Sequence, residues 1–199
     1  MDFTEFFDNQ NNRESFKRGD IIYREGDSPE HIYIVTSGIV GLFHITESGK
    51  ETFLRLFGHG EIMGHRSALA AEPYHANAIC LSKVQLIKFS LETFYSKLKE
   101  NEQIKREILT KLAQDLGSAE LRLSNLIDKT APKRVSEALL YLKLKYPEQI
   151  WTRKEIAEFS STTLETVTRI MGKLEEISAI EKKGRDFIIV NQELLMSHE

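Results

Sequence analysis

Only one cysteine, Cys80, and no long hydrophobic run occur in this sequence of 199 residues. A single cysteine excludes an intrachain disulfide and any all-cysteine zinc or iron–sulfur site within one chain. No segment approaches the ~18 uncharged apolar residues that indicate a membrane-spanning helix. The first residues are acidic and lack the basic start and apolar core of a signal peptide, so we expect a cytoplasmic protein. Cys80 lies in an apolar run and is expected to be a small buried hydrophobic residue.

The sequence also lacks an excess of positive charge. It has 27 Lys+Arg against 30 Asp+Glu, which gives a net charge of −3. Residues 131–199 hold equal numbers of basic and acidic side chains, so this part is not basic as a whole either. Its positive charge is gathered locally, at Lys154, Arg169 and Lys173 and between Lys182 and Arg185. The net charge therefore does not exclude DNA as a partner, and it predicts weak non-specific binding.

Short runs rich in β-branched and aromatic residues fill the first ninety residues. Glycine-bearing turns separate them at intervals near ten residues, which is typical of a β-sandwich or barrel. Gly26 and Gly38 lie in two of these turns, where glycine adopts backbone conformations that cost other residues energy. A short segment with helix-forming composition, residues 67–71, is ended by Pro73. We expect strands at 21–23, 31–35, 39–43, 52–57, 76–81 and 84–89.

A different period begins after residue 100. Apolar residues recur at intervals of four and three, which predicts an amphipathic helix over 101–130 with a narrow apolar face. A helix of ~30 residues is about 45 Å long, more than a small β-domain needs to cover its core. A covering helix and a dimer interface are both compatible with the pattern, and we favour the dimer interface. Its predicted residues are Ile104, Ile108, Leu112, Leu116, Ala119, Leu123 and Leu126.

The segment from Trp151 to Ile177 has the pattern of a helix-turn-helix. Thr152 can cap a first short helix, and Glu155 three residues later completes a capping-box pattern. Thr163 can cap a second helix that runs to Ile177. A small residue, a turn residue and an aliphatic residue have the spacing of this motif, namely Ala157, Ser161 and Val167. Glycine would suit the turn better than Ser161, which we expect to be left-handed at a cost of ~1 kcal/mol.

The exposed face of the second helix carries side chains that suit the edges of DNA bases. Arg169 can donate to the paired acceptors of guanine, Glu165 can accept from cytosine N4, and the methyl group of Thr168 can meet thymine. Glu165 and Arg169 are also four residues apart, so a surface ion pair is the alternative interpretation. Residues 179–190 then read as two strands around a Lys-Gly-Arg turn, the wing of a winged helix, whose basic residues can neutralise phosphates. The predicted DNA contacts are Arg153, Lys154, Thr163, Leu164, Glu165, Thr168, Arg169, Lys173, Lys182, Lys183 and Arg185.

Short motifs connect both halves of the chain with one known family. The first half contains Gly19-Asp20, Glu25-Gly26-Asp27, Ile34-Val35-x-Ser37-Gly38 and Gly60-Glu61-x-x-Gly64. The second contains Thr152-Arg153-x-Glu155-Ile156-Ala157 and Glu165-Thr166-Val167-Thr168-Arg169. In this order they resemble the Crp/Fnr family of bacterial transcription regulators. The first set alone would indicate only a cyclic-nucleotide-binding-type domain, which also occurs in kinases and channels.

The resemblance implies an α+β fold with three parts. These are an antiparallel β-roll of the jelly-roll type as a sensor domain (1–100), a long dimerisation helix (101–130) and a winged helix-turn-helix that binds DNA (131–199). It further implies a homodimer on an inverted-repeat operator in double-stranded DNA, with RNA polymerase as a further partner. Leu164 stands where the cyclic-AMP-responsive branch has an arginine, so the operator preference should differ.

The residues of the implied effector pocket depart from the pattern of cyclic-AMP binders. The ribose-binding glutamate is replaced by His65, the phosphate-binding Arg-Ser pair by His75-Ala76, and the adenine-facing hydroxyl residues by Ala119-Glu120. Without the guanidinium clamp, cyclic AMP is not expected to bind tightly, and neither an iron–sulfur cluster nor another cofactor is predicted. The candidate pocket residues are Gly60, Glu61, Ile62, Met63, Gly64, His65, Arg66, Ser67, His75, Ala76, Ala119 and Glu120.

Two questions stay open for the first domain. Arg66 stands where a short helix begins, so an anion can use its side chain and the helix N-terminus; alternatively, His65 and Arg66 face solvent or pack against the chain. The effector is thus a small molecule other than cyclic AMP, or there is none. The alternatives for the whole protein are a cyclic-nucleotide-responsive regulator or a nucleotide-binding signalling subunit. A cupin-type metalloenzyme needs clustered histidines, and those of this chain are scattered, so we do not expect an enzyme.

Overall fold

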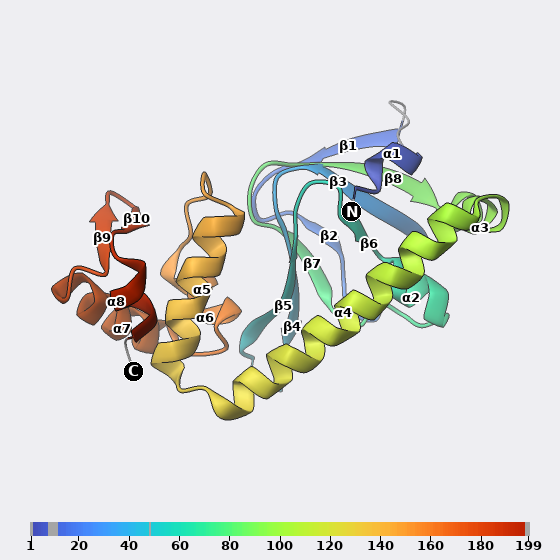
Figure 1. Ribbon diagram of the computed structural model, residues 1–199. Helices are drawn as coiled ribbons and strands as arrows, with labels where there is room; N and C mark the ends of the chain where they lie inside the picture. Colours follow the sequence, from blue (N-terminus) through green and yellow to red (C-terminus); the bar gives the residue numbers. More distant parts are fainter. Residues whose placement is uncertain (1, 8–11, 48, 198–199) are drawn as a thin grey trace. The chain divides into compact units, whose positions relative to one another are not determined.

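The computed structural model describes residues 2–7, 12–47 and 49–197. The chain forms two compact units, 1–118 and 119–199, which we call the N-terminal and C-terminal units (Figure 1). The long helix α4, Glu102–Asp128, begins in the first unit and ends in the second. The other elements of the N-terminal unit are α1 (Thr4–Phe7), β1 (Arg13–Phe16), β2 (Ile21–Tyr23), β3 (His31–Ser37), β4 (Val40–Ile45), β5 (Glu51–Phe57), β6 (Ile62–Met63), α2 (His65–Ala70), β7 (Asn77–Cys80), β8 (Val84–Ser90) and α3 (Leu91–Glu100).

Two four-stranded antiparallel sheets build the N-terminal unit. Their strand orders are β1-β8-β3-β6 and β2-β7-β4-β5. Long-range pairs such as Ile34 opposite Ile87 fix the register of the first sheet, and Gly41 opposite Ile79 does so in the second. The predicted antiparallel β-roll is confirmed.

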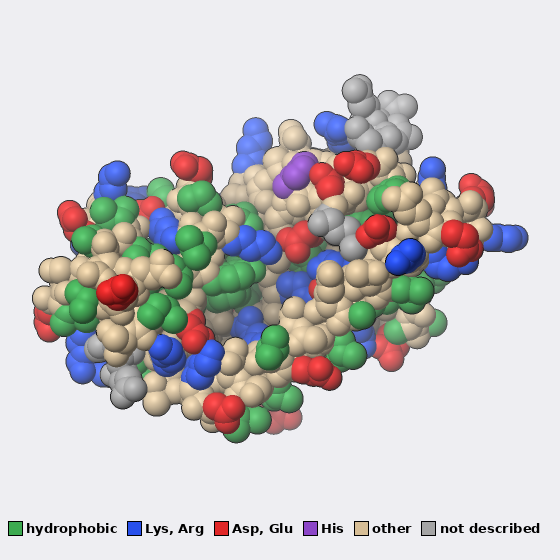
Figure 2. Space-filling view, viewed as in Figure 1, with side chains coloured by type: hydrophobic (Ala, Val, Ile, Leu, Met, Phe, Trp, Pro, Cys, Tyr) green, Lys and Arg blue, Asp and Glu red, His purple; other side chains and the backbone are tan. Residues whose placement is uncertain are grey.

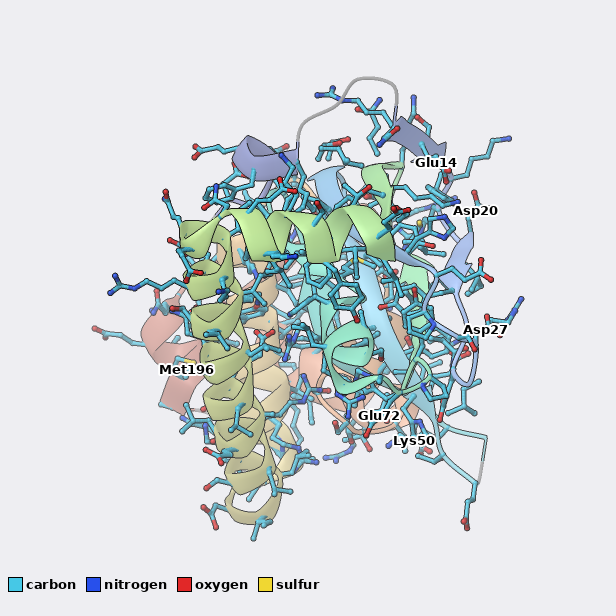
Figure 3. All side chains as sticks on the ribbon, turned by 90° about the vertical axis from the view of Figure 1, so that its right-hand side faces the viewer. Glu14, Asp20, Asp27, Lys50, Glu72 and Met196 are labelled. Atoms are coloured by element: carbon cyan, nitrogen blue, oxygen red, sulfur yellow. The ribbon has the colours of Figure 1, made fainter. Side chains whose placement is uncertain are left out.

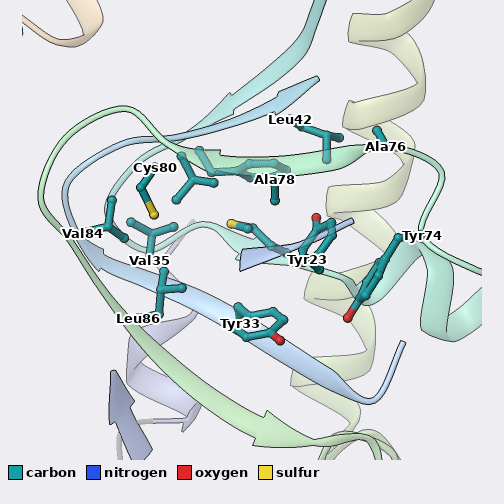
Figure 4. Packing of buried hydrophobic residues seen from close by; sticks show 13 residues of the cluster. Tyr23, Tyr33, Val35, Leu42, Tyr74, Ala76, Ala78, Cys80, Val84 and Leu86 are labelled. Carbon is teal, nitrogen blue, oxygen red and sulfur yellow. The ribbon is translucent and has the colours of Figure 1, made fainter. Parts of the chain in front are cut away.

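The core of the roll lies between the two sheets and is rich in tyrosine (Figure 4). The rings of Tyr23 and Tyr74 stack with centroids 3.8 Å apart, and the Tyr74 hydroxyl donates to the His31 carbonyl. Cys80 lies in the same cluster beside Val35 and Val84, and it is buried as predicted. Burial raises the pKa of its thiol to about 12, so the thiolate that redox chemistry requires does not form near neutral pH.

Gly38 makes the tight connection between β3 and β4. Its φ is +84°, and a Cβ there would lie 2.2 Å from the Lys83 carbonyl oxygen. Any other residue would push apart the turn and the adjacent chain. The glycine is thus required both by its backbone conformation and by the close approach of the neighbouring chain.

The C-terminal unit is a helical domain with a two-stranded hairpin. After α4 ends at Asp128, Thr130 caps the next helix and Pro132 lies in its first turn. The elements are α5 (Ala131–Lys145), α6 (Arg153–Phe159), α7 (Leu164–Glu176), β9 (Ile180–Lys183), β10 (Asp186–Ile189) and α8 (Gln192–Ser197). Among the described residues no helix is long and apolar enough to cross a membrane.

Candidate DNA-contact surface and sensor site

Helix α6 begins with the predicted capping box. The Thr152 hydroxyl accepts from the Glu155 amide at 3.2 Å, and the Glu155 carboxylate accepts from the Thr152 amide at 2.8 Å. Two amides that would otherwise lack partners at the helix start are thereby satisfied. The turn before α7 follows the prediction too, because Ser161 is left-handed with φ +54°. Thr163 accepts from the Thr166 amide and caps α7.

Helix α7 buries one face and exposes the other. Val167, Ile170, Met171 and Leu174 are buried, as the sequence pattern predicts. The outer face carries Thr163, Leu164, Glu165, Thr168, Arg169 and Lys173, all of which are exposed. The Thr168 hydroxyl donates to the Leu164 carbonyl at 2.8 Å, so this donor is used within the helix. In the described part of the chain, Glu165 and Arg169 form no ion pair with each other or with any other side chain.

The hairpin β9–β10 forms the predicted wing. Its strands pair from Ile180–Ile189 to Lys183–Asp186, and Gly184 at the tip has φ +63°. Phe187 is buried beneath the wing, and the Lys143 ammonium lies 4.9 Å from its ring centroid. Lys143 also pairs with Asp186 at 2.6 Å. These contacts anchor the wing base, and the basic side chains Lys182, Lys183 and Arg185 remain exposed at its tip.

A groove of about 660 Å³ runs between the start of α6, the outer face of α7 and the wing. The predicted DNA-contact residues that line it come from all three of these segments, although they are scattered along the chain: Arg153, Lys154, Leu164, Thr168, Lys182 and Arg185. Lys154 pairs with Glu158 at 3.3 Å, which reduces its charge toward a ligand. The arrangement brings the outer face of α7 and the basic wing to one concave surface.

The predicted dimer face of α4 needs a correction at its beginning. Ile104 and Ile108 are 1% and 2% exposed and pack with Phe94 in a second core cluster of the N-terminal unit, with Leu112 beside them. These side chains cover their own domain and cannot contact a partner helix. The later members Leu116, Leu123 and Leu126 are 62%, 61% and 41% exposed. Leu109 and Ile127, which the sequence pattern did not include, are exposed as well.

Several residues of the candidate effector pocket lie in the interior of the roll. Ile62, Met63 and Ala76 are fully buried in the hydrophobic core. The Ser67 hydroxyl is buried and donates to the Pro73 carbonyl. These side chains pack against or bond to other parts of the roll. Gly60 and Gly64 are left-handed, and Gly64 precedes α2. Ala119 and Glu120 belong to the C-terminal unit, where Glu120 is exposed, and His75 is exposed.

His65 and Arg66, two neighbours in the sequence, point to different environments. Arg66 is exposed and pairs at 2.9 Å with Glu72, which lies just past the end of α2 and is labelled in Figure 3. His65 is 3% exposed. Burial lowers its pKa to about 4, although the nearby Asp115 carboxylate raises it. The structure thus favours packing of His65 and solvation of Arg66 over an anion site at this short helix.

A charge cluster of five residues includes His65, and the sequence pattern does not reveal most of it. Arg55 of β5 and Lys111 of α4 both contact the Asp115 carboxylate, the latter at 2.7 Å. The His65 Nε2 lies 4.0 Å from Asp115, and Glu61 lies 3.8 Å from Lys111. Only the Lys111–Asp115 spacing of four residues is a sequence signal. The pairing of α4 with β5 is a tertiary contact without a local pattern.

Comparisons with known proteins cover both units. The chain matches the cyclic nucleotide-binding domain over residues 13–101 and the Crp-like helix-turn-helix domain over 133–197. It is similar to the cyclic AMP receptor protein of Thermus thermophilus, with 30% identity over 166 residues that cover 82% of this chain and 77% of that protein. A CRP-like cAMP-activated global transcriptional regulator of Mycobacterium tuberculosis is 25% identical, covering 90% of this chain and 84% of that protein.

A solved structure supports the fold independently. FixK2 from Bradyrhizobium japonicum superimposes with a TM-score of 0.80 and covers 92% of this chain and 94% of its own. The two sequences are 22% identical, so this likeness concerns the fold. Among the described residues no three His, Cys, Asp or Glu side chains gather as a metal site.

Proposed function

Because the chain belongs to the Crp/Fnr family of DNA-binding transcription regulators, we propose that it acts as a homodimer on an inverted-repeat operator. Two recognition helices α7 would enter successive major grooves about 34 Å apart. The N-terminal unit would control their spacing, in response to an effector other than cyclic AMP or to none. RNA polymerase is the further partner that this role implies.

The outer face of α7 is the observation that carries the proposal of sequence reading. Arg169 and Glu165 lie four residues apart without a mutual ion pair in the described structure, so both are available to base edges. Arg169 would donate to guanine O6 and N7, and Glu165 would accept from cytosine N4. The Thr168 hydroxyl already bonds the Leu164 carbonyl, which leaves its methyl group for apolar contact with thymine. Exposed basic residues of the wing would add phosphate contacts without sequence information.

Selection of binding sites from random double-stranded DNA tests this assignment. The full-length protein should enrich an inverted repeat, and its binding should weaken steeply with salt. Replacement Arg169→Ala should cost ~1–3 kcal/mol of binding free energy and relax the preference at one position of each half-site. Arg66→Ala, at an exposed arginine of the N-terminal unit, is the matched control. It should change neither the binding free energy nor the sequence preference. Identical preferences of the wild type and Arg169→Ala would show that Arg169 reads no base.

The exposed leucines of α4 support the homodimer. Leu116 and Leu123 lie seven residues apart, so they occupy the same position in successive heptads. Light scattering should give the mass of a dimer for the wild type. Leu116→Glu or Leu123→Glu would bury a charge in the interface and should shift the protein to monomers with weaker operator binding. Leu144→Glu adds the same charge at a 71% exposed leucine outside α4 and should leave the dimer intact. A monomeric wild type would refute the proposal.

Cyclic AMP is proposed not to be a tight ligand. The position of the phosphate-binding arginine is taken by His75, and the next residue, Ala76, is fully buried in the core. No fixed guanidinium therefore replaces the usual clamp at these two positions. Titration calorimetry of the purified protein with cyclic AMP should show no binding in the low micromolar range. A dissociation constant in that range would instead support the cyclic-nucleotide-responsive alternative.

A further inference from the structure

The Asp115 carboxylate binds two cations from different parts of the N-terminal unit. Its Oδ2 contacts Arg55 Nη1 from β5, and its Oδ1 lies 2.7 Å from Lys111 Nζ one turn earlier on α4. The Lys111 and Asp115 side chains are 11% and 14% exposed. Arg55 also lies over the ring of Phe57, at 5.8 Å from the ring centroid. Both carboxylate oxygens are thus used in a largely buried setting, where an ion pair is screened less than at the surface.

His65 closes the same site from α2. Its side chain is 4% exposed, and its ring nitrogens make no hydrogen bond of ordinary geometry among the described residues, although the Ile62 backbone interacts with the ring and raises its pKa. Its Nε2 faces Asp115 Oδ2 at 4.0 Å. Buried polar groups of this kind are rare in folded proteins, and each calls for an explanation. In this protein the His65 ring faces the carboxylate of Asp115, a residue of the same chain.

The charges of the cluster balance without an external ion. Arg55 and Lys111 are positive, Asp115 and Glu61 are negative, and His65 is neutral near pH 7 because burial lowers its pKa to about 4. The Glu61 carboxylate also accepts from the Gly58 amide at 2.7 Å, which holds it in place. A further buried anion would have no uncompensated cation to pair with, and its desolvation would oppose binding.

We infer that Arg55, Lys111 and His65 form an anion-binding site whose occupant is the chain's own Asp115 carboxylate. The inference rests on the proposed function and specifies its regulation. Asp115 ties α4 to β5 and α2, as an anionic effector would do from outside. It does so one residue before Leu116, an exposed leucine of the proposed dimer face. The site therefore needs no external anion to hold α4, and DNA binding does not depend on one.

Removal of the internal carboxylate should create an external anion site. Asp115→Ala deletes a group equivalent to formate and leaves two cations facing one carboxylate. Formate should then bind in its place and restore the contacts of Arg55 and Lys111. In the wild type, where Asp115 occupies the site, formate, acetate and inorganic phosphate should not bind there.

The experiment compares thermal unfolding and operator binding of the full-length protein in formate and in chloride at equal ionic strength. The operator is the DNA selected with the wild type. Asp115→Ala should melt at a lower temperature and bind about tenfold or more weakly, within the usual range of coupling between sites. Formate should reverse both effects along a saturable curve, and chloride should not. Glu72→Ala removes an exposed carboxylate that is also paired with an arginine, and it should show no formate effect.

A second variant covers the case in which Asp115→Ala does not fold. Arg55→Gln with Asp115→Asn removes both partners, leaves no lone buried charge between them and should fold. It should still bind the operator more weakly than the wild type, because α4 is no longer held. Wild-type affinity in this variant would overturn the inference, as would a wild type whose DNA binding requires an added anion. Failure of the wild type to bind any selected DNA would instead refute the proposed function, while formate-dependent melting of Asp115→Ala would still support the anion site.

Discussion

Charged side chains are placed in opposite ways in the two units. In the N-terminal unit, Asp115 and Glu61 neutralise Arg55 and Lys111 inside the domain. In the C-terminal unit, Arg169 of α7 and the basic residues at the wing tip are exposed. On the face drawn in Figure 2, basic and acidic side chains are interspersed on both units. Net charge therefore says little about either function, because what matters is which charges are already paired within the fold.

This contrast predicts which property each residue controls. Substitution of a charged or apolar group that is paired or buried within the fold should lower stability first. DNA binding should then weaken because the fold is less stable. A group left on the surface should affect affinity and leave stability almost unchanged, because surface substitutions rarely alter stability by more than a few tenths of a kcal/mol. Substitutions in the two units therefore test this contrast.

The largest expected effect contrasts two positions on α4. Ile108→Ala should cost roughly 2–5 kcal/mol of unfolding free energy, because it opens a cavity in the core of the N-terminal unit. Leu116→Ala, at a position that is 62% exposed, should cost little within one chain and weaken the dimer instead. Urea unfolding at several protein concentrations separates the two, since only the dimer contribution depends on concentration. If both variants lose a similar unfolding free energy at every protein concentration, Ile108 and Leu116 do not differ in the way proposed.

His65 should make the stability of the N-terminal unit depend on pH. Its folded pKa of about 4 lies below the ordinary histidine value of 6.5, so the unfolded chain binds a proton more readily. Its contribution is fully present above pH 6.5 and declines as the pH falls to 4, by about 3 kcal/mol. His65→Gln should flatten the pH dependence of urea unfolding over this interval. An unchanged pH dependence in His65→Gln would contradict this assignment.

Local features of the C-terminal unit could be predicted from sequence. The capping box of Thr152, the left-handed Ser161 and the wing turn at Gly184 each depend on residues within a few positions of one another. Such short-range rules use backbone sterics and local hydrogen bonds, which the sequence displays directly. The strands of the β-roll could be located for the same reason, from their composition and turns.

Tertiary pairing could not be predicted in the same way. The four-and-three spacing on α4 continues from Ile104 to Leu126, although its first members face the roll core and later ones are exposed. The spacing of apolar residues predicts that a helix has an apolar face, but it does not show which part of the protein packs against that face. Asp115 and Arg55 are far apart in the sequence, and nothing near either residue indicates the other. The charge cluster of the N-terminal unit could therefore be found only in the structure, whereas the candidate DNA contacts could be named from the sequence.

The wing tip should control affinity without controlling stability. Replacement of Lys182, Lys183 and Arg185 by glutamine should weaken binding to all DNA sequences to a similar degree. The slope of log affinity against log salt should fall by about 0.9 for every phosphate that the variant no longer neutralises. Anisotropy titrations over a salt series measure this, and the selected operator sequence should stay the same. A changed sequence preference with an unchanged slope would place these residues at bases instead of phosphates.

The smallest expected effect concerns the helix cap that supports this surface. Thr152→Ala removes the acceptor for the Glu155 amide and should cost ~1 kcal/mol of unfolding free energy. Thr152→Ser keeps the hydroxyl and should behave as the wild type. Operator affinity should fall little in either variant, because the cap holds α6 and does not itself need to contact bases. A large drop in affinity in Thr152→Ala, with no more than the expected loss of stability and full recovery in Thr152→Ser, would make this hydroxyl a DNA contact as well as a cap.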